Sequence, residues 1–183
     1  MPSYRRNFTP GGTYLFTLVT HGRRPILTSD RARNNLRRAI SDVKSRRPFD
    51  LIALVLLPDH LHAVWTLPPG NANDSVRWSQ IKEGFTRLFL DAHDVRVPVS
   101  PSRSRHRERA DWQRRFWEHT CRDEDDLKSC VDYIHWNPVK HGLATSVEEY
   151  PRSSFPRFVR EGEYESGWGG GGGFPGSIGA GWD

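Results

Sequence analysis

Four stretches of the chain have the length and side-chain composition of β-strands. Residues 14–20 and 51–57 are rich in β-branched, aromatic and leucine side chains, which favour strands. Residues 60–67 form a third such stretch, and residues 115–119 form a shorter one. Two residues typical of turns separate the second stretch from the third. These two strands are therefore expected to pair as an antiparallel hairpin.

Three other segments place apolar residues three or four positions apart, the spacing of a helix with one buried face. The first extends over residues 30–47, and the second begins at residue 73 or 74. The third extends over residues 123–137, where Asp123 can cap the first turn. Pro138 disfavours helical backbone at the residue before it, so the third helix is expected to end there.

The predicted order is strand, helix, strand, strand, helix, strand, helix. The first six elements match the split βαβ plan, in which an antiparallel sheet carries its helices on one face. We therefore predict an α+β, ferredoxin-like fold with a third helix added. Residues 1–150 are expected to form one domain, with a mobile, basic loop near residues 93–110. Residues 151–183, rich in Pro and Gly, are expected to form a tail that packs loosely or not at all.

The charge distribution favours a polyanionic partner. The chain has 27 Lys and Arg against 22 Asp and Glu, a formal net charge of +5, and its pI is about 9.6. This excess is modest, but the basic residues gather in clusters, most densely between residues 103 and 115. Such clusters are typical of proteins that neutralise phosphates. Solvated helix faces and a basic loop are the purely structural alternative.

Nothing in the sequence indicates export or a membrane. No apolar run approaches the roughly 18 residues of a membrane span, and no apolar segment follows the basic N-terminus as in a secretory signal. Cys121 and Cys130 are the two cysteines, and without an export signal they are expected to be reduced thiols. We therefore predict a cytoplasmic protein without a membrane partner.

Two histidines flank Leu61 at the start of the third predicted strand. Because side chains alternate along a strand, His60 and His62 point to the same face, about 7 Å apart along the chain. Both imidazoles can therefore reach one metal ion. Histidines on a half-exposed strand are also common as surface residues, so the pair alone is weak evidence for a metal site.

The third predicted helix carries residues that could complete such a site. At 3.6 residues per turn, Tyr133 and Asn137 lie together, one turn apart. They lie beside the apolar stripe of the helix, so they are expected to project from the rim of the core, near the edge of the sheet. The structural alternative is a boundary tyrosine and an asparagine that ends the helix before Pro138. Residues 140–142 would then be an ordinary helix end with a capping glycine.

Together these residues fit phosphodiester cleavage better than separate structural roles. The reaction requires neutralised phosphate oxygens and a nucleophile placed in line. Mg²⁺ or Mn²⁺, held by the two histidines and the Asn137 amide oxygen, would supply the first, and imidazole ligands favour Mn²⁺. Tyr133 would supply the second through a covalent phosphotyrosine that conserves bond energy for rejoining. A tyrosine hydroxyl has a pKa of about 10, so the metal or an unidentified base must help it to ionise.

Several motifs occur together and in a fixed order. They are Tyr-Arg-Arg at residues 4–6, Gly-Gly-Thr at 11–13, Leu-Pro-Asp-His-Leu-His at 57–62, Trp-Thr-Leu-Pro at 65–68, Phe-Trp-Glu-His at 116–119 and the run from Asp132 to Gly142. In these motifs the chain resembles the REP-associated tyrosine transposases, over about residues 4–154. These are single-tyrosine transposases of the wider His-hydrophobic-His nuclease superfamily.

The resemblance implies a bacterial, nucleoid-associated enzyme whose catalytic domain is residues 1–150. It implies single-stranded DNA as the substrate, carrying hairpins formed by repetitive extragenic palindromes (REP). It implies His60, His62 and Asn137 as the ligands of a divalent metal, and Tyr133 as the nucleophile. The expected products are a 5′-phosphotyrosine and a free 3′-OH. This branch of the family also favours a monomer over a dimer.

The resemblance further implies that the N-terminal motifs read a short single-stranded guide beside the hairpin, where glycine lets the backbone approach a base. The residues expected to contact DNA are Arg5, Arg6, Gly11, Gly12, Thr13, Lys82, Arg114, Arg115 and Lys140. Two features depart from the family: a long basic loop over residues 97–110 and the glycine-rich end. Both bear on DNA specificity and regulation rather than on the chemistry.

Two other functions remain open at this point. The chain could be a binding module of the same fold that grips structured DNA or RNA without cutting it. It could also be a hydrolase that uses a transition metal and water, with Tyr133 in a structural role. Binding that is indifferent to chelators indicates the first alternative, and cleavage that survives Tyr133→Phe indicates the second.

Overall fold

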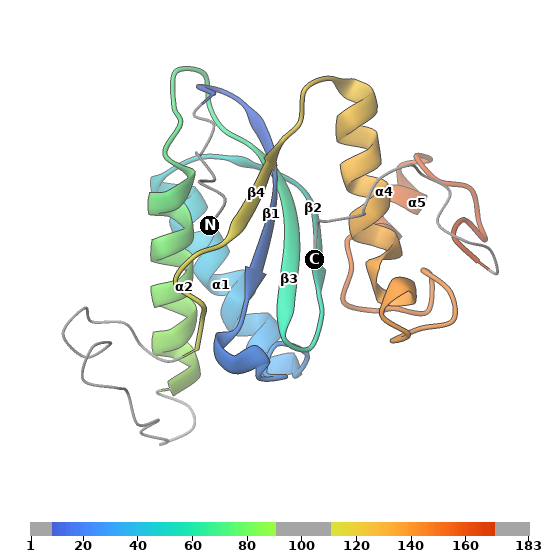
Figure 1. The fold of residues 1–183 in the computed structure, drawn as a ribbon, viewed down its shortest axis with the longest axis horizontal. Helices are drawn as coiled ribbons and strands as arrows, with labels where there is room; N and C mark the ends of the chain where they lie inside the picture. Colours follow the sequence, from blue (N-terminus) through green and yellow to red (C-terminus); the bar gives the residue numbers. More distant parts are fainter. Residues whose placement is uncertain (1–8, 91–110, 171–183) are drawn as a thin grey trace, which may run out of the picture.

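The computed structural model describes residues 9–90 and 111–170, which form an antiparallel four-stranded sheet with helices on both faces (Figure 1). The elements are β1 (Thr13–Val19), η1 (His21–Arg23), α1 (Asp30–Arg46), β2 (Asp50–Leu56), β3 (His60–Thr66), α2 (Asp74–Leu90), β4 (Trp117–Thr120), α4 (Glu124–Lys140) and α5 (Phe155–Arg160). The strand order is β2-β3-β1-β4. β3 thus lies between the two strands of the β1-α1-β2 unit, as the predicted ferredoxin-like plan requires.

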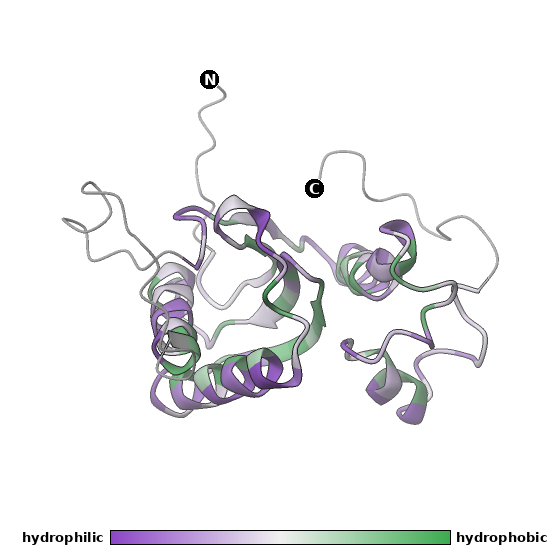
Figure 2. Ribbon diagram, turned by 90° about the horizontal axis from the view of Figure 1, so that it is seen from below, coloured by the Kyte–Doolittle hydropathy of each residue, from purple (hydrophilic) through white to green (hydrophobic). Residues whose placement is uncertain are grey.

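Helices α1 and α2 cover one face of the sheet (Figures 1 and 2). Ser29 caps α1, because its hydroxyl oxygen accepts a hydrogen bond from the backbone N–H of Ala32 at 3.1 Å. Beneath the helices, Phe16 of β1 and Trp65 of β3 are fully buried against Trp78 of α2. The rings of Trp65 and Trp78 stack with their centroids 4.3 Å apart. No helix in the described ranges is long and apolar enough to cross a membrane.

Helix α4 covers the opposite face of the sheet (Figure 1). Its apolar side includes Val131 and Ile134, which are buried against Leu15, Val55 and Val64 of the three strands β1, β2 and β3. Because side chains alternate along a strand, the sheet presents one apolar set to α1 and α2 and a second set to α4. The predicted third helix therefore forms a layer of its own.

Helix α4 continues three residues beyond its predicted end, through Pro138 to Lys140. A proline removes a single backbone N–H, and the packing of α4 on the sheet outweighs that local loss. Gly142, two residues after the last helical residue Lys140, stops the helix with a left-handed φ of 66°. There the Gly142 N–H donates to the Val139 carbonyl and the Leu143 N–H donates to the Pro138 carbonyl, which is a Schellman end.

Residues 151–170 pack against β2 and α4, so the prediction of a loosely packed tail is wrong for this segment. The Ser154 N–H donates to the Leu54 carbonyl at 2.8 Å, at the outer edge of β2. His135 of α4 has its Nε2 atom 2.9 Å from Ser154 Oγ. Its Nδ1 lies 3.3 Å from the Tyr164 hydroxyl. Sequence periodicity could not show this packing, because contacts between distant segments stabilise it.

The burial of His135 predicts a pH-dependent stability. Burial, with a smaller contribution from Arg157, lowers the pKa of His135 from 6.5 to about 3. Between these values the unfolded chain binds a proton that the folded chain does not. The free energy of unfolding is therefore largest above the unfolded pKa and falls as the pH drops, by up to about 1.4 kcal/mol per pH unit.

The comparison is denaturant unfolding of the wild-type chain and of His135→Gln between about pH 7 and pH 4. Glutamine retains a polar group beside Ser154 but does not titrate, so stability should depend less on pH in the variant. Equal slopes for the two chains would contradict a neutral, buried His135.

Candidate active site

The predicted histidine pair lies at the centre of the sheet. His60 and His62 begin β3, an inner strand, and pair with Val19 and Thr17 of β1. Their ring centroids are 5.1 Å apart. His62 is fully buried and His60 is 6% exposed. The two imidazoles therefore lie close together as the alternation predicts, under α4 rather than on a half-exposed surface.

Each imidazole is held through its Nδ1 atom. His62 Nδ1 lies 2.8 Å from Thr17 Oγ1, and His60 Nδ1 lies 2.6 Å from Asp59 Oδ1. Burial acts to raise the pKa of Asp59, but the hydrogen bond from His60 and the ion pair with Arg23 outweigh it and lower the pKa. Asp59 is thus an ionised acceptor, so His60 carries its proton on Nδ1. A metal would be bound through Nε2 of both rings, the arrangement common in histidine metal sites.

Tyr133 projects from α4 onto this pair. Its ring centroid lies 5.3 Å from that of His62, edge to face, and its side chain is 1% exposed. The Nζ atom of Lys140 lies 5.2 Å from the centroid of the Tyr133 ring. The predicted position at the rim of the core is wrong, because α4 packs on β2 and β3 and the buried Tyr133 ring lies against His62 of the inner strand β3. The tyrosine and the histidine pair nevertheless lie close together, as predicted.

Asn137 lies one turn from Tyr133 and one turn from His141 on the same side of α4. The His141 and His60 rings are 5.1 Å apart, so this side of the helix faces both histidines of β3. Both Oδ1 and Nδ2 of Asn137 are buried without a hydrogen-bond partner among the described residues. A buried amide normally has partners, and a cation at Oδ1 would supply one. Two imidazoles and this oxygen therefore fit a divalent metal such as Mn²⁺ or Mg²⁺.

Sequence reasoning missed three side chains of this site. Asp59 was interpreted as a turn residue, although its position next to His60 was a usable signal. His141 was interpreted as part of a helix end, although it follows Tyr133 by two helical turns. Thr17 could not be found, because its partnership with His62 depends on the register of β1 against β3.

A family comparison covers most of this site. Residues 10–137 match the family described as "Transposase IS200 like". The matched region begins before β1 and ends at Asn137, so it includes both histidines and the tyrosine. The chain belongs to this family.

Individual relatives refine the assignment to the REP-associated tyrosine transposases. The REP-associated tyrosine transposase of Escherichia coli K12 is 41% identical over 170 residues, which cover 93% of this chain and 92% of that protein. A solved structure of a REP-associated tyrosine transposase bound to a REP hairpin is 40% identical, with a TM-score of 0.76. The match covers 93% of this chain and 92% of the chain in that structure. The family resemblance and the predicted fold are thereby confirmed.

In this transposase the predicted guide-reading residues lie far from the histidines. Thr13 begins β1, whereas His60 pairs with the last residue of that strand, so about 20 Å separates them at 3.3 Å per residue. Gly11 has a left-handed φ of 74° in the preceding turn. A Cβ atom on Gly12 would lie 2.9 Å from the Thr9 carbonyl oxygen. Both glycines are thus already required by the turn before β1.

The predicted basic contacts of the transposase are divided between regions. Lys140 is exposed at the end of α4, beside the site, and Arg114 and Arg115 are exposed just before β4. Lys82 lies on α2, where its Nζ donates to the Gln113 carbonyl at 2.9 Å. Three predicted features lie outside the described residues: Arg5 and Arg6, the basic loop at 97–110, and the glycine-rich end at 171–183.

The orientation of His60 by Asp59 yields a test of the metal site. Asp59→Asn removes the negative charge that fixes the His60 tautomer, so the affinity for Mn²⁺ should fall by about 10- to 100-fold. Isothermal titration with Mn²⁺ measures this change.

Arg23→Gln is the matched control, because it removes the ion pair with Asp59 (3.1 Å) and leaves the carboxylate. Its Mn²⁺ affinity should stay close to that of the wild-type chain. An equal loss in both variants, or no loss in Asp59→Asn, would contradict the assigned role of Asp59.

Proposed function

We propose that this transposase cleaves and rejoins single-stranded DNA that carries REP-type hairpins, with Tyr133 as the nucleophile and a divalent metal at His60 and His62. One observation carries the proposal: the Tyr133 ring of α4 lies 5.3 Å from the His62 ring of β3. A potential nucleophile thus meets a potential metal-ligand pair. The hairpin-bound relative, 40% identical over most of its length, supports hairpin DNA as the substrate.

The metal would be held by His60 Nε2, His62 Nε2 and Asn137 Oδ1. When bound, Mg²⁺ or Mn²⁺ neutralises charge on the non-bridging phosphate oxygens and leaves coordination positions for phosphate and water. Thr17 and Asp59 keep the two imidazoles oriented before DNA arrives. Such pre-organisation lowers the cost of assembling the site.

The proposed chemistry exchanges one phosphodiester for another. Tyr133 Oη forms a bond to phosphorus while the bond from phosphorus to the 3′ oxygen breaks. The tyrosine proton passes to a base, and the departing oxygen gains a proton, which gives a 5′-phosphotyrosine and a free 3′-OH. In rejoining, a 3′-OH attacks the phosphotyrosine and releases Tyr133. The ammonium of Lys140, 5.2 Å from the ring centroid, favours a negatively charged tyrosine oxygen.

DNA would enter at the C-terminal end of α4. Tyr133 is 1% exposed, so its side chain or the end of α4 must move before a phosphate reaches the hydroxyl. Lys140 and His141 are exposed there and would meet the incoming strand. A lysine at this position attracts the phosphate backbone without reading its sequence.

More distant residues would bind the rest of the DNA. Arg114 and Arg115 would contact phosphates, and Lys82 would hold their segment in place through Gln113 (2.9 Å). The turn at residues 11–13 would approach guide bases, and Arg5 and Arg6 would assist it.

The contact between Tyr133 and His62 of the same molecule supports a site that is assembled within one chain. We therefore infer that a monomer is the active unit. We further propose that it acts in the bacterial cytoplasm, on the nucleoid, where hairpin-forming repeats are its substrate.

The test is adduct formation on a labelled hairpin oligonucleotide with Mn²⁺. The wild-type chain should form a covalent protein–DNA adduct, and Tyr133→Phe should reduce its yield by more than about 100-fold because the nucleophilic oxygen is gone. Tyr164→Phe is the matched control, since that hydroxyl contacts His135 on another side of α4; its adduct should persist.

The same experiment distinguishes the alternatives. Adduct formation by Tyr133→Phe would overturn the nucleophile assignment. Cleavage without an adduct in that variant, lost in His60→Ala, would indicate hydrolysis by metal and water. Tight hairpin binding that is indifferent to chelators, with no cleavage by the wild-type chain under any metal, would indicate a binding module.

A further inference from the structure

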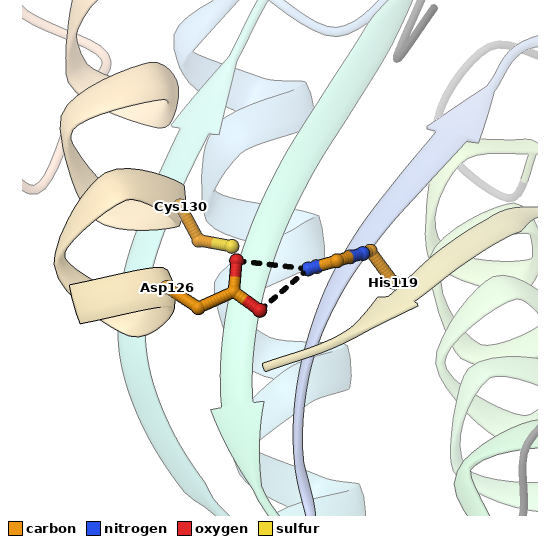
Figure 3. Close-up of side chains that lie close together, drawn as sticks. All are labelled: His119, Asp126 and Cys130. Atoms are coloured by element: carbon orange, nitrogen blue, oxygen red, sulfur yellow. Dashed lines mark hydrogen bonds and ion pairs between the residues drawn. The ribbon is translucent and has the colours of Figure 1, made fainter. Parts of the chain in front are cut away.

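A second group of metal-ligating side chains lies near the N-terminal end of α4. Figure 3 shows His119 of β4 pointing toward Asp126 and Cys130 of α4. One ligand atom from each residue lies within 4.8 Å of the other two. Within residues 9–90 and 111–170, this is the one group of three or more His, Cys, Asp and Glu side chains that meets this condition.

We propose that His119, Asp126 and Cys130, with Cys121 as a fourth ligand, bind one Zn²⁺ ion. Zinc in proteins prefers four nitrogen, sulfur and oxygen ligands in a tetrahedron. The Sγ atoms of Cys121 and Cys130 are 3.6 Å apart. The chain has two cysteines, so both of its thiols lie in this cluster.

Two of the distances between ligand atoms lie close to the edge lengths of a zinc tetrahedron. Zn–S bonds of about 2.3 Å place two sulfurs about 3.8 Å apart, and Zn–N and Zn–O bonds of about 2.0 Å place nitrogen and oxygen about 3.3 Å apart. The observed separations are 3.6 Å between the sulfurs and 3.0 Å between His119 Nε2 and Asp126 Oδ2. Shifts of a few tenths of an ångström would bring these two edges to the ideal length. Cys121 does not belong to the group whose ligand atoms all lie within 4.8 Å of one another, so its thiol would move closer to His119 and Asp126 to complete the tetrahedron.

Local structure holds the ligands in position. Asp126 and Cys130 lie one turn apart on α4 and so share one side of the helix. His119 pairs with Leu15 of β1, whose side chain belongs to the core under α4. Cys130 is fully buried and Asp126 is 5% exposed. The His119 side chain is 23% exposed, which leaves a route by which an ion can enter.

Zinc binding would exchange protons for the ion. In its absence Asp126 is hydrogen bonded to His119 Nε2 and accepts from the backbone N–H and Nε of Arg122 at 3.0 Å each. On binding, the two thiol protons pass to solvent and His119 keeps one proton, on Nδ1. Zn²⁺ with two thiolates and one carboxylate carries a net charge of −1. The adjacent guanidinium of Arg122 offsets this charge.

This site would differ in kind from the candidate active site. Sulfur ligands select zinc, whereas histidine with amide oxygen and water suits Mn²⁺ or Mg²⁺. The zinc ion would link β4 to α4. Its ligand Cys130 lies three residues before Tyr133 on that helix. Its role would therefore be structural: it would fix the helix that carries the nucleophile.

Cobalt provides the test, because Co²⁺ replaces Zn²⁺ in tetrahedral sites and thiolate ligands give it an intense near-ultraviolet charge-transfer band. The full-length chain, with its thiols kept reduced, is titrated with Co²⁺. The band should saturate at one equivalent and disappear when Zn²⁺ is added. The active site holds no sulfur, so it cannot produce this signal. His60→Ala/His62→Ala should retain the band and bind one Zn²⁺.

Cys130→Ser and Asp126→Asn should each weaken Zn²⁺ binding by more than about tenfold, as measured by competition with a chromophoric chelator. His21→Gln is the matched control, since His21 is an exposed histidine outside the cluster and its loss should change nothing. Circular dichroism confirms that each variant is folded. A wild-type chain that shows no sulfur-to-cobalt band at saturation, or that holds Zn²⁺ no more tightly than Asp126→Asn, would overturn the proposal.

Discussion

The packing of α4 on β2 and β3 brings Tyr133 and His141 of the helix against the histidine pair of β3. Val131 and Ile134 are buried against Val55 and Val64, and each such side chain contributes about 1.5–3 kcal/mol when fully buried. This packing fixes the rotation of α4 about its own axis. Because Tyr133 immediately precedes Ile134, the same rotation places its ring on the neighbouring part of β3.

The apolar and the chemical side chains of β3 lie on one face and alternate along it. Val64 packs under α4, and His62, two residues earlier, points the same way and contacts Thr17 and Tyr133. Asn137 follows Tyr133 by one turn of α4. Burying such groups costs free energy unless partners compensate. The core tolerates these polar side chains because hydrogen bonds hold both imidazoles. A metal would bind the side-chain amide oxygen of Asn137. A face built only for stability would have continued with apolar residues.

The sequence was sufficient for the order of the main strands and helices and for the proximity of Tyr133 to the histidine pair. Periodicity located the strands and helices, and alternation placed His60 and His62 on one side of β3. Neither pattern could show how deeply α4 lies on the sheet. Tyr133 was therefore expected at the rim of the core and is buried instead. Local preference at Pro138 also ended α4 too early, because tertiary packing is invisible to a local rule.

Sequence reasoning missed the role of Thr17 and the packing of residues 151–170 for a related reason. Each acquires its role through a partner distant in sequence: Thr17 through the pairing of β1 with β3, and the segment through hydrogen bonds to β2 and contacts with His135. Asp59 and His141, by contrast, lie at short, regular spacings from recognised residues, and the same spacing rules could have included them.

The packing of residues 151–170 also has a consequence for how the protein is made. During synthesis, β1, β2 and β3 emerge with α1 and α2 well before α4 and the segment that covers its other side. One apolar face of the newly formed sheet therefore stays uncovered until almost the whole chain has left the ribosome. A prematurely terminated chain would present this face to chaperones and proteases.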